Sequence, residues 1–309
     1  MKNKILLLGG SGKLGKELQK ELKKQSIDYI APSHNECDIE DFLKLFKVFQ
    51  REHPNIIIHS AGCIDTEKCE TDKQYCLDVN VIGTYNVIKC CRLLNIRLVF
   101  ISSEYVFRGG EYAYFRNSGI NPKNSYGLSK GCGELMTQTL DDYLIIRAPF
   151  IRATTFPYEK AFADQYTSRQ YVHEITEDII NVSISNECGI CHIVGKYQSV
   201  YELAKQTNKN VKPIDTPQKL KNILPMKLNL VAPYAVAVDS CTHGLELCIR
   251  YQQIGVINIP NRTYISVPFL ANKLKIQLEW RDEEWQDYYK LNEHFKPIYD
   301  AAVLWKRDS

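Results

Sequence analysis

The stretch "KILLLGGSGKLGKELQKELKK" (residues 4–24) decides the fold class of this 309-residue chain. It begins with a short apolar run, which is typical of a parallel strand buried on both faces. Glycines follow at once, and leucines then recur at positions 14, 18 and 22, which is the spacing of one helix face. The stretch therefore predicts a buried strand, a tight turn and an amphipathic helix.

The same alternation continues through the first half of the chain. Further strands are predicted at residues 27–33, 55–62, 96–103 and 143–149, and further helices at 39–50, 79–95 and 125–140. On the helix at 39–50, the residues expected on the buried face are Ile39, Phe42, Leu43 and Phe46. This order of elements predicts an α/β fold, a Rossmann-type doubly wound parallel sheet with helices on both faces.

Gly9, Gly12 and Gly15 form a G-x-x-G-x-x-G motif between the first strand and the first helix. Gly9 permits a tight turn, Gly12 lets the backbone approach a pyrophosphate, and Gly15 lets the helix pack against the strand. The helix N-terminus adds N–H donors and a positive dipole. We therefore expect a dinucleotide cofactor here, with an ordinary turn as the alternative.

The segment after the second strand, "APSHNECDIED" (residues 31–41), leaves the choice of cofactor open. Its first positions carry neither the acid that favours NAD nor the arginine that favours NADP. Asp38 and Ile39 come later and could contact the adenine. His34 either touches a 2′-phosphate or lies in a surface loop. Both NADPH and NADH therefore remain candidates.

A hydroxyl, a phenol and an ammonium are predicted at the same crevice. Ser103 follows the fourth strand in "ISSEYVF", and Tyr126 and Lys130 lie four residues apart on one face of the next helix. Ser103 could hold a substrate carbonyl while Tyr126 gives the proton, with Lys130 and a nicotinamide lowering the pKa of the phenol. The alternative is a solvated helix face.

Composition narrows the function classes. The net charge is +3 with acids and bases interspersed, which argues against binding to nucleic acid or a membrane surface. The eleven cysteines are scattered, and the C-x-x-C pair Cys188 and Cys191 lacks a second pair at zinc-ribbon spacing, so packed reduced thiols are favoured over a metal or redox site. The N-terminal apolar run is too short for a signal peptide, and no segment reaches transmembrane length. We expect a soluble, cytoplasmic protein.

These motifs resemble the extended short-chain dehydrogenase/reductase family, and within it the dTDP-4-dehydrorhamnose reductases. The matching segments are "GGSGKLG", "CDIED", "HSAGCIDTEKCE", "VNVIGTYNV", "ISSEYVFRGG", "NPKNSYGLSKGCGE" and "YLIIRAPFIR". The resemblance implies that Ser103, Tyr126 and Lys130 are catalytic and that Asn80 is structural. It implies that the cofactor, besides Tyr126 and Lys130, is bound by Gly9, Gly12, Lys13, Leu14, Gly15, Asp38, Ile39, Ser60, Ala61 and Gly62.

The resemblance implies an NAD(P)H-dependent reductase of a 4-keto-6-deoxy sugar nucleotide, in deoxysugar or surface polysaccharide biosynthesis. Its domain would span residues 1–230, with the substrate-binding part within about 152–230. Glu104 stands where such reductases usually carry aspartate. The alternatives are an epimerase or dehydratase of the same family, and a non-catalytic nucleotide-binding regulatory or scaffold protein.

Residues 231–309 predict a second, partial α/β segment. Strands are expected at 234–238, 255–260 and 275–280, and helices at 242–252 and 264–274, the first of which would bury Leu245, Leu247, Cys248 and Tyr251. The turn "DSCTHG" (residues 239–244) is either an anion cradle or an ordinary helix cap.

This segment is similar to the N-terminal part of the DegT-type sugar-nucleotide aminotransferases, which use pyridoxal phosphate (PLP). The resemblance implies that Ser240, Cys241 and Thr242 match the phosphate-binding residues and that Asp300 matches the partner of the pyridinium nitrogen. The Schiff-base lysine of that family lies further downstream, and Lys306 is too close to Asp300 to replace it. PLP binding by this chain alone is therefore not expected. A homodimer, or a partner that completes this segment, is left open.

Overall fold

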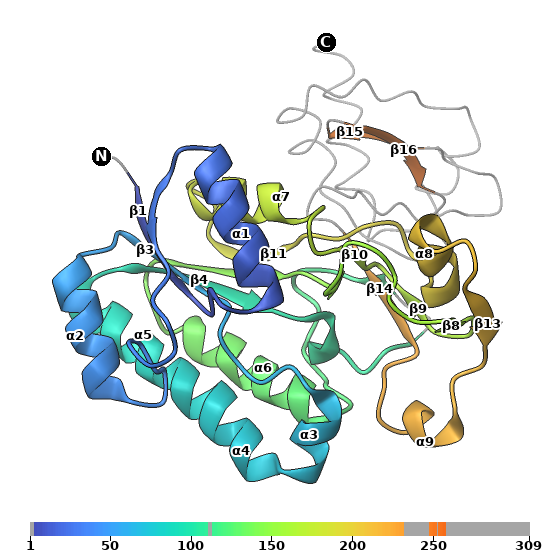
Figure 1. The fold of residues 1–309 in the computed structure, drawn as a ribbon, viewed down its shortest axis with the longest axis horizontal. Helices are drawn as coiled ribbons and strands as arrows, with labels where there is room; N and C mark the ends of the chain where they lie inside the picture. The colour runs from blue at the N-terminus through green and yellow to red at the C-terminus, as the bar shows by residue number, and fades with distance from the viewer. Residues whose placement is uncertain (1–2, 111–112, 232–246, 252, 258–309) are drawn as a thin grey trace, which may run out of the picture. The chain divides into compact units, whose positions relative to one another are not determined.

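A computed structural model describes residues 3–110, 113–231, 247–251 and 253–257 (Figure 1). The chain divides into two compact units, Met1–Pro233 and Tyr234–Ser309, which we describe separately. The first unit is built around one parallel sheet, with several smaller sheets formed mainly by residues after 150.

The central sheet has six strands in the order β11-β6-β4-β3-β1-β2. Its strands are β1 (Lys4–Leu8), β2 (Asp28–Ile30), β3 (Ile56–His59), β4 (Arg97–Ser102), β6 (Tyr143–Arg147) and β11 (Gly189–His192). Every neighbouring pair is parallel, which confirms the predicted doubly wound sheet. The strand order reverses between β1 and β3, and ligands of such sheets bind in the crevice outside the carboxyl ends at that point.

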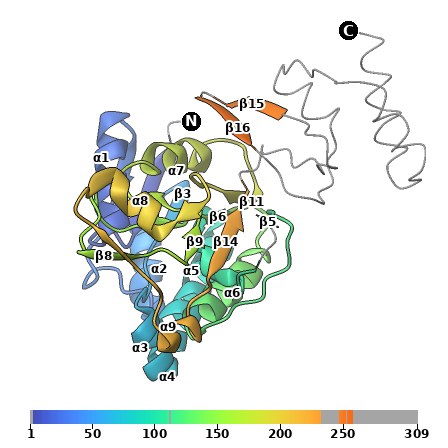
Figure 2. The same cartoon turned by 90° about the vertical axis from the view of Figure 1, so that its right-hand side faces the viewer.

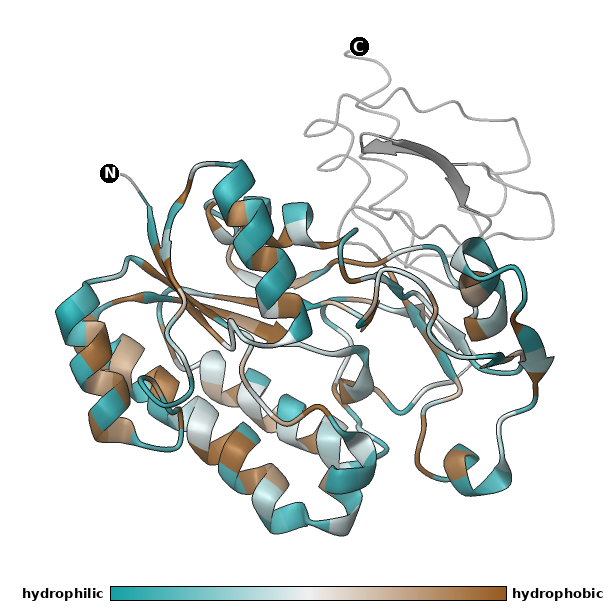
Figure 3. Cartoon of the chain, viewed as in Figure 1, coloured by the Kyte–Doolittle hydropathy of each residue, from teal (hydrophilic) through white to brown (hydrophobic). Residues whose placement is uncertain are grey.

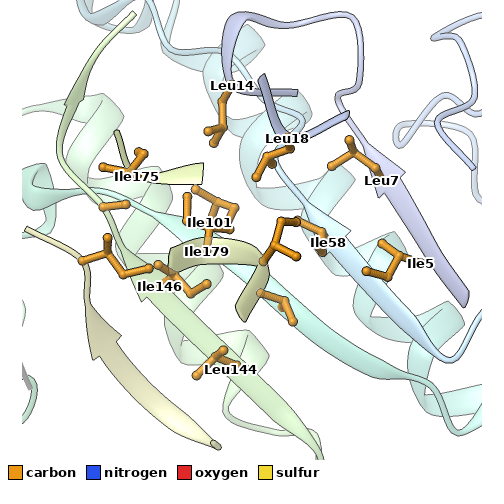
Figure 4. Close-up of a cluster of buried hydrophobic side chains, with 14 of the residues drawn as sticks. Ile5, Leu7, Leu14, Leu18, Ile58, Ile101, Leu144, Ile146, Ile175 and Ile179 are labelled. Atoms are coloured by element: carbon orange, nitrogen blue, oxygen red, sulfur yellow. The ribbon is translucent and has the colours of Figure 1, made fainter. Parts of the chain in front are cut away.

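Helices cover both faces of this sheet (Figure 1). They are α1 (Lys13–Lys24), α2 (Phe42–Glu52), α5 (Gly83–Leu94), α6 (Ser125–Thr137) and α7 (Thr176–Ser183). Leucines of α1 and isoleucines of α7 pack with the strands into one core, shown in Figure 4, and residues of α2 and α5 pack into a second core on the opposite face. The strands are mostly apolar in Figure 3, as expected for a sheet buried on both faces.

Helix α2 begins later than predicted, which changes its buried face. The Asp41 side chain accepts a hydrogen bond from the Lys44 N–H and caps the helix, so Ile39 lies in the preceding loop. Leu45, Val48 and Phe49 are buried, whereas Leu43 is 67% exposed. The prediction that Leu43 lies on the buried face is therefore wrong, because the helical phase was counted from a residue outside the helix.

Two short helices between β3 and α5 were not predicted. They are α3 (Thr66–Thr71) and α4 (Lys73–Leu77), capped by the side chains of Asp65 and Asp72. A π-helical turn, η1 (Asp78–Ile82), then leads into α5, so the helix predicted from residue 79 is α-helical only from Gly83. Helices α3 and α4 lie side by side below the sheet in Figures 1 and 2, and α3 contacts α6.

The rest of the first unit contains small sheets and short helices. The strands are β5 (Ala113–Tyr114), β7 (Phe150–Ile151), β8 (Lys160–Phe162), β9 (Tyr166–Thr167), β10 (Gln170–Tyr171), β12 (Gln198–Ser199), β13 (Lys212–Ile214) and β14 (Lys227–Leu230). The helices are η2 (Glu104–Val106), α8 (Val200–Thr207) and α9 (Gln218–Lys221). One four-stranded sheet has the order β12-β9-β14-β5, so residues 113–114 join the later segment (Figure 2).

In the second unit, the described residues form an antiparallel hairpin of β15 (Leu247–Tyr251) and β16 (Gln253–Ile257). The helix predicted at 242–252 is therefore wrong over residues 247–251. These residues include a β-branched and an aromatic side chain, which favour strands, and they pair with residues 253–257. The predicted strand at 255–260 overlaps β16.

The remaining elements expected in this unit, at 234–238, 264–274 and 275–280, lie outside the described residues. So do Ser240, Cys241, Thr242, Asp300 and Lys306. Within the described ranges, no helix combines the length and the apolar character needed to cross a bilayer.

Candidate active site

The glycine-rich turn and the loop after β3 touch across the point where the strand order reverses. Gly9 has a φ of +84°, and a Cβ atom on it would lie 2.6 Å from the Ala61 nitrogen. A Cβ on Gly15 would lie 2.2 Å from the Gly9 carbonyl oxygen, while the Gly12 N–H donates to that same oxygen at 3.0 Å. Only glycine fits at positions 9 and 15, because backbone occupies the space of a side chain.

The N-terminus of α1 is suited to bind a pyrophosphate. Its N-cap residue, Gly12, supplies no side-chain cap, and the first turn carries no acidic residue, so its N–H groups and positive dipole face outward without competition. Lys13 is exposed at this end. Leu14 is buried in the core beneath and offers only its backbone to a ligand. These residues fit the dinucleotide predicted from the glycine motif.

Of the two residues predicted to contact the adenine, Asp38 lies near the surface and Ile39 lies in the core. The Asp38 carboxylate accepts from the Glu40 N–H at 3.0 Å and lies 3.6 Å from His34 Nε2. Ile39 is 5% exposed, and a Cβ on Gly83 would lie 2.8 Å from its side chain. Asp38 is therefore placed where a ligand can reach it, whereas the Ile39 side chain packs into the core.

Asn80, on the π-helical turn η1, joins the loop after β3 to helix α6. Its amide accepts from the Cys63 N–H at 2.7 Å, and donates to the Cys63 carbonyl and to Ser129 Oγ, both at 2.9 Å. In the same loop, the Ser60 hydroxyl donates to the Leu8 carbonyl at 2.7 Å. One buried amide thus fixes the position of Ala61 and Gly62 relative to the helix, and π-helical turns are frequent at functional sites.

Ser103 and Tyr126 are brought together at the carboxyl end of β4. Helix α6 is capped by Asn124, and a Cβ on Gly127 would lie 2.0 Å from the Tyr105 carbonyl oxygen, so the helix start is pressed against the segment after Ser103. The Ser103 side chain is close enough to the Tyr126 phenol to lower its pKa. This is the arrangement predicted for a proton donor beside a carbonyl-holding hydroxyl.

The pKa of Tyr126 is raised in this chain, whereas the sequence led us to expect that Lys130 together with a bound nicotinamide would lower it. Burial raises the pKa to about 12, although the Ser103 side chain opposes the rise. The Lys130 ammonium, which was expected to lower it, is held 4.1 Å above the centroid of the Phe100 ring. Tyr126 is therefore fully protonated at neutral pH and suited to give a proton.

Lys130 is a buried ammonium one helical turn beyond Tyr126. It is 8% exposed, and burial lowers its pKa to about 8, while the nearby Glu134 carboxylate opposes the shift. Lys130 thus keeps its charge at neutral pH but loses it just above. The side chain of His59, also buried, has a pKa lowered to about 3 by burial and by Lys130, so it adds no charge.

A buried ion pair that we call the sheet pair joins α6 to β6. Arg147 donates from Nε and Nη2 to the two carboxylate oxygens of Glu134, at 2.9 and 2.7 Å. Ser102 Oγ donates to the same carboxylate at 2.5 Å, and Arg147 Nη1 lies 3.3 Å from His192 Nε2. The helix that carries Tyr126 and Lys130 is thereby fixed to the strands β4, β6 and β11.

A second buried ion pair, the joint pair, links the loop after β4 to the small sheets. Arg169 Nε donates to Glu104 at 2.6 Å, and Thr167 Oγ1 donates to the other oxygen of this carboxylate at 2.7 Å. Arg169 Nη2 also donates to the Tyr105 hydroxyl at 3.0 Å, and the Tyr105 ring packs edge-on against Tyr126. Glu104 is 2% exposed, so its carboxylate is engaged within the protein.

Glu134, Arg147 and Arg169 were not among the functional residues predicted from the sequence. Arg147 ends the apolar strand "YLIIR", and a charged residue in a strand buried on both faces must find a partner, so a signal was present. Nothing in the pattern indicated which acid that partner would be. In the described part of the chain, no group of three or more His, Cys, Asp or Glu side chains is arranged to hold a metal ion.

Comparison with known proteins identifies relatives of this fold and site. Residues 2–165 match the family model "RmlD substrate binding domain". The chain is 29% identical to the spore coat polysaccharide biosynthesis protein SpsK of Bacillus subtilis over 62% of its own length and 72% of SpsK. It is 30% identical to the dTDP-4-keto-6-deoxy-D-glucose reductase of Streptomyces niveus, over 49% of its own length and about half, 54%, of that protein.

A solved structure also matches much of the chain. The crystal structure of dTDP-4-dehydrorhamnose reductase from Bacillus anthracis in complex with NADP is 27% identical, with a TM-score of 0.64. The match covers 74% of this chain and 94% of the reductase.

Proposed function

The chain belongs to the RmlD substrate binding domain family, and from that premise we propose that it is an NADPH-dependent reductase of a 4-keto-6-deoxy sugar nucleotide. The observation that carries the proposal is the proximity of the Ser103 hydroxyl to the Tyr126 phenol at the carboxyl end of β4, where it affects the pKa of the phenol. These two residues lie at the same end of the parallel sheet as the glycine turn, which leads into the uncapped N-terminus of α1. A proton donor and a pyrophosphate site in one crevice are what carbonyl reduction requires.

The proposed roles follow from the state of each group. Ser103 donates a hydrogen bond to the substrate carbonyl, and Tyr126, protonated at neutral pH, gives the proton to the carbonyl oxygen as it becomes an alkoxide. Lys130 supplies a buried positive charge one helical turn beyond Tyr126, and we propose that this charge helps to hold the nicotinamide end of the cofactor. When bound, the nicotinamide supplies the hydride. Gly9, Gly12, Gly15 and the loop Ser60–Gly62 would hold the cofactor.

Within the two nicotinamide cofactors, we propose NADPH as the preferred donor. The stretch after β2 presents Ser33 and His34, both exposed, and the nearest acid in it, Glu36, is engaged by the Ser33 hydroxyl and N–H at 2.7 and 2.9 Å. The nearest carboxylate at this strand end is therefore already hydrogen-bonded through one oxygen, which disfavours its use for an NAD ribose diol. The NADP complex of the Bacillus anthracis reductase supports the same choice.

The environment of Glu104 disfavours a dehydratase. Dehydratases of the extended family have an acidic residue after the catalytic hydroxyl residue, and Glu104 holds that position here. Its carboxylate is occupied by Arg169 and Thr167 and is 2% exposed, so it is not free to act on a substrate. An epimerase would retain tightly bound NAD through purification. The presence of copurified NAD therefore distinguishes an epimerase from the proposed reductase.

For residues 231–309 we propose a separate segment with the likeness to PLP-dependent aminotransferases noted above. The support is the sequence resemblance alone. We expect that the purified full chain mixed with PLP develops no protein-bound absorbance band, because Lys306 lies too close in sequence to Asp300 to match the Schiff-base lysine of that family. A band that resists dialysis would contradict this expectation.

The test of the proposed function is a spectrophotometric assay of NADPH and NADH oxidation with dTDP- and UDP-4-keto-6-deoxyglucose. We expect sugar-dependent oxidation that is faster with NADPH and fastest with one of the two nucleotides. Cofactor binding without turnover on either sugar would favour a regulatory protein. NAD that copurifies and is not consumed would favour an epimerase.

A further inference from the structure

Three cysteines, Cys63, Cys69 and Cys76, gather beside the candidate active site. Cys69 Sγ lies 3.7 Å from Cys63 Sγ, within the contact distance of two thiols. Cys76 Sγ accepts from Asn80 Nδ2 at 3.7 Å and lies 3.9 Å from the Ser125 carbonyl. Cys63 follows the loop that would hold the cofactor, and Ser125 precedes Tyr126. The mechanism proposed above uses none of these thiols.

We propose that Cys63 and Cys69 form an oxidative modification site, in which a peroxide closes a disulfide that slows the enzyme. The Cys63 thiolate attacks one oxygen of hydrogen peroxide, which gives a sulfenic acid and releases hydroxide. The Cys69 sulfur then attacks the Cys63 sulfur, the S–O bond breaks, and the thiol proton leaves with the oxygen as water. The balance is two thiols and one H₂O₂ to one disulfide and two waters.

The different burial of the two thiols sets the order of the steps. Cys63 is half-buried and can meet a peroxide from solution, whereas Cys69 is 0% exposed. Burial, together with the thiols of Cys76 and Cys63, raises the pKa of Cys69. Cys69 is therefore protected from direct oxidation and acts as the resolving thiol, since nucleophilicity requires thiolate character and access.

The geometry allows the Cys63–Cys69 disulfide after a small movement of the two cysteines. This movement would also displace neighbouring residues of the candidate site. The sulfurs are 3.7 Å apart, and a disulfide is about 2.0 Å long, so they must approach by roughly 1.7 Å. Asn80 holds both the N–H and the carbonyl of Cys63. Any shift of the Cys63 backbone toward Cys69 therefore strains the amide that positions Ala61 and Gly62.

Two sets of hydrogen bonds connect the cysteine loop and α3 to the segment that carries Tyr126. Asn80 also donates to Ser129 Oγ, and that hydroxyl donates to the Tyr126 carbonyl at 2.8 Å. Glu70, next to Cys69 on α3, accepts from the Ser125 N–H at the start of α6. We expect the disulfide to weaken cofactor binding and to lower turnover by up to about 100-fold, since a misplacement of about 1 Å in a catalytic constellation can cost that much in rate. This consequence rests on the proposed function, whereas the disulfide itself does not.

The first readout is chemical and independent of activity. The full chain is treated with hydrogen peroxide, alkylated and digested with trypsin, which cuts after Lys68 and separates the two cysteines. We expect a linked pair of peptides, residues 52–68 joined to 69–73, that is lost on reduction with dithiothreitol. Cys63 oxidised alone, or Cys63 linked to any other cysteine, would overturn the proposal.

The second readout compares variants, each against its own reduced form. Fluorescence titration measures the affinity for NADPH of the oxidised and of the reduced protein. The ratio of the first to the second should be below one in the wild type and in Cys188→Ser, a control for the exposed cysteine. It should stay near one in Cys63→Ser and in Cys69→Ala. NADPH should also slow formation of the linked peptides in the wild type, because coupling between the two sites is reciprocal. Formation of the disulfide with an unchanged NADPH affinity would overturn the coupling to the site.

Discussion

Two buried ion pairs hold the candidate site, and they differ in what surrounds them. The sheet pair, Glu134–Arg147, has side chains 1% and 2% exposed and connects a helix to three strands of one sheet. In the joint pair, Glu104–Arg169, the arginine is 18% exposed, and the pair connects the loop after β4 to the small sheets. We infer that the sheet pair mainly maintains the fold, and that the joint pair mainly positions Tyr105 and Tyr126.

The largest effect is expected from breaking the sheet pair. Arg147→Met leaves the Glu134 carboxylate buried without a guanidinium, and we expect a loss of about 3–5 kcal/mol in the free energy of unfolding. Denaturant titration measures it. Arg51→Met is the matched control, because Arg51 pairs with Glu52 at the surface and should contribute less than about 1 kcal/mol. Equal losses in the two variants would contradict the role of the sheet pair.

Breaking the joint pair should affect catalysis more than stability. In Arg169→Met we expect a loss of about 2 kcal/mol in unfolding free energy, because water reaches part of this pair and softens the penalty. We expect kcat/KM to fall by about 10–100-fold, because Tyr105 loses its partner and Tyr126 loses its packing surface. Steady-state kinetics checks this. A variant with normal kinetics and a large loss of stability would reverse our assignment.

The two pairs should also differ in their effect on the pH profile. Lys130 has a pKa lowered to about 8, so its charge is present below that pH and is lost as the pH rises through it. We expect log kcat/KM to decline above about pH 8, by about tenfold per unit.

The same pH profile distinguishes the effect of Glu134 from the effect of the joint pair. The Glu134 carboxylate raises the pKa of Lys130, so Glu134→Gln should move the decline to lower pH, provided that circular dichroism shows a folded protein. Arg169→Met should leave the midpoint in place. A rate that is constant from neutral pH to about pH 10 would show that Lys130 does not take part.

The smallest effects should come from the single hydroxyl in each pair. Ser102→Ala removes a donor to Glu134, and Thr167→Val removes a donor to Glu104. Each should lower the unfolding free energy by about 1–2 kcal/mol, as expected for a hydrogen bond to a buried charge. Only Thr167→Val should also lower kcat/KM. Loss of activity in Ser102→Ala with an unchanged melting temperature would contradict our inference that the sheet pair mainly maintains the fold.

The sheet was predictable from sequence because parallel strands buried on both faces appear as continuous apolar runs, as in "KILLLGG". The hairpin at 247–257 was not, since short apolar segments can suit a helix or a strand and tertiary pairing decides between them. The phase of α2 was misjudged at Leu43 for a different reason, because only the cap at Asp41 fixes the first helical residue.

The candidate site was predictable where its residues are close in sequence. Tyr126 and Lys130 share one helix turn, and the three glycines share one turn of chain. The ion pairs could not be predicted, because Glu104 and Arg169 are 65 residues apart and meet only through tertiary structure. The raised pKa of Tyr126 was missed because burial, which lies outside any sequence pattern, outweighs its neighbours.

The most direct test of the central claim is the rate of sugar-dependent NADPH oxidation by Tyr126→Phe. Phenylalanine keeps the ring that packs against Tyr105 but has no proton to give, so we expect turnover to fall by at least about 100-fold while the affinity for NADPH stays within about twofold. A variant that binds NADPH normally and retains full turnover would show that Tyr126 is not the proton donor and would contradict the proposed mechanism.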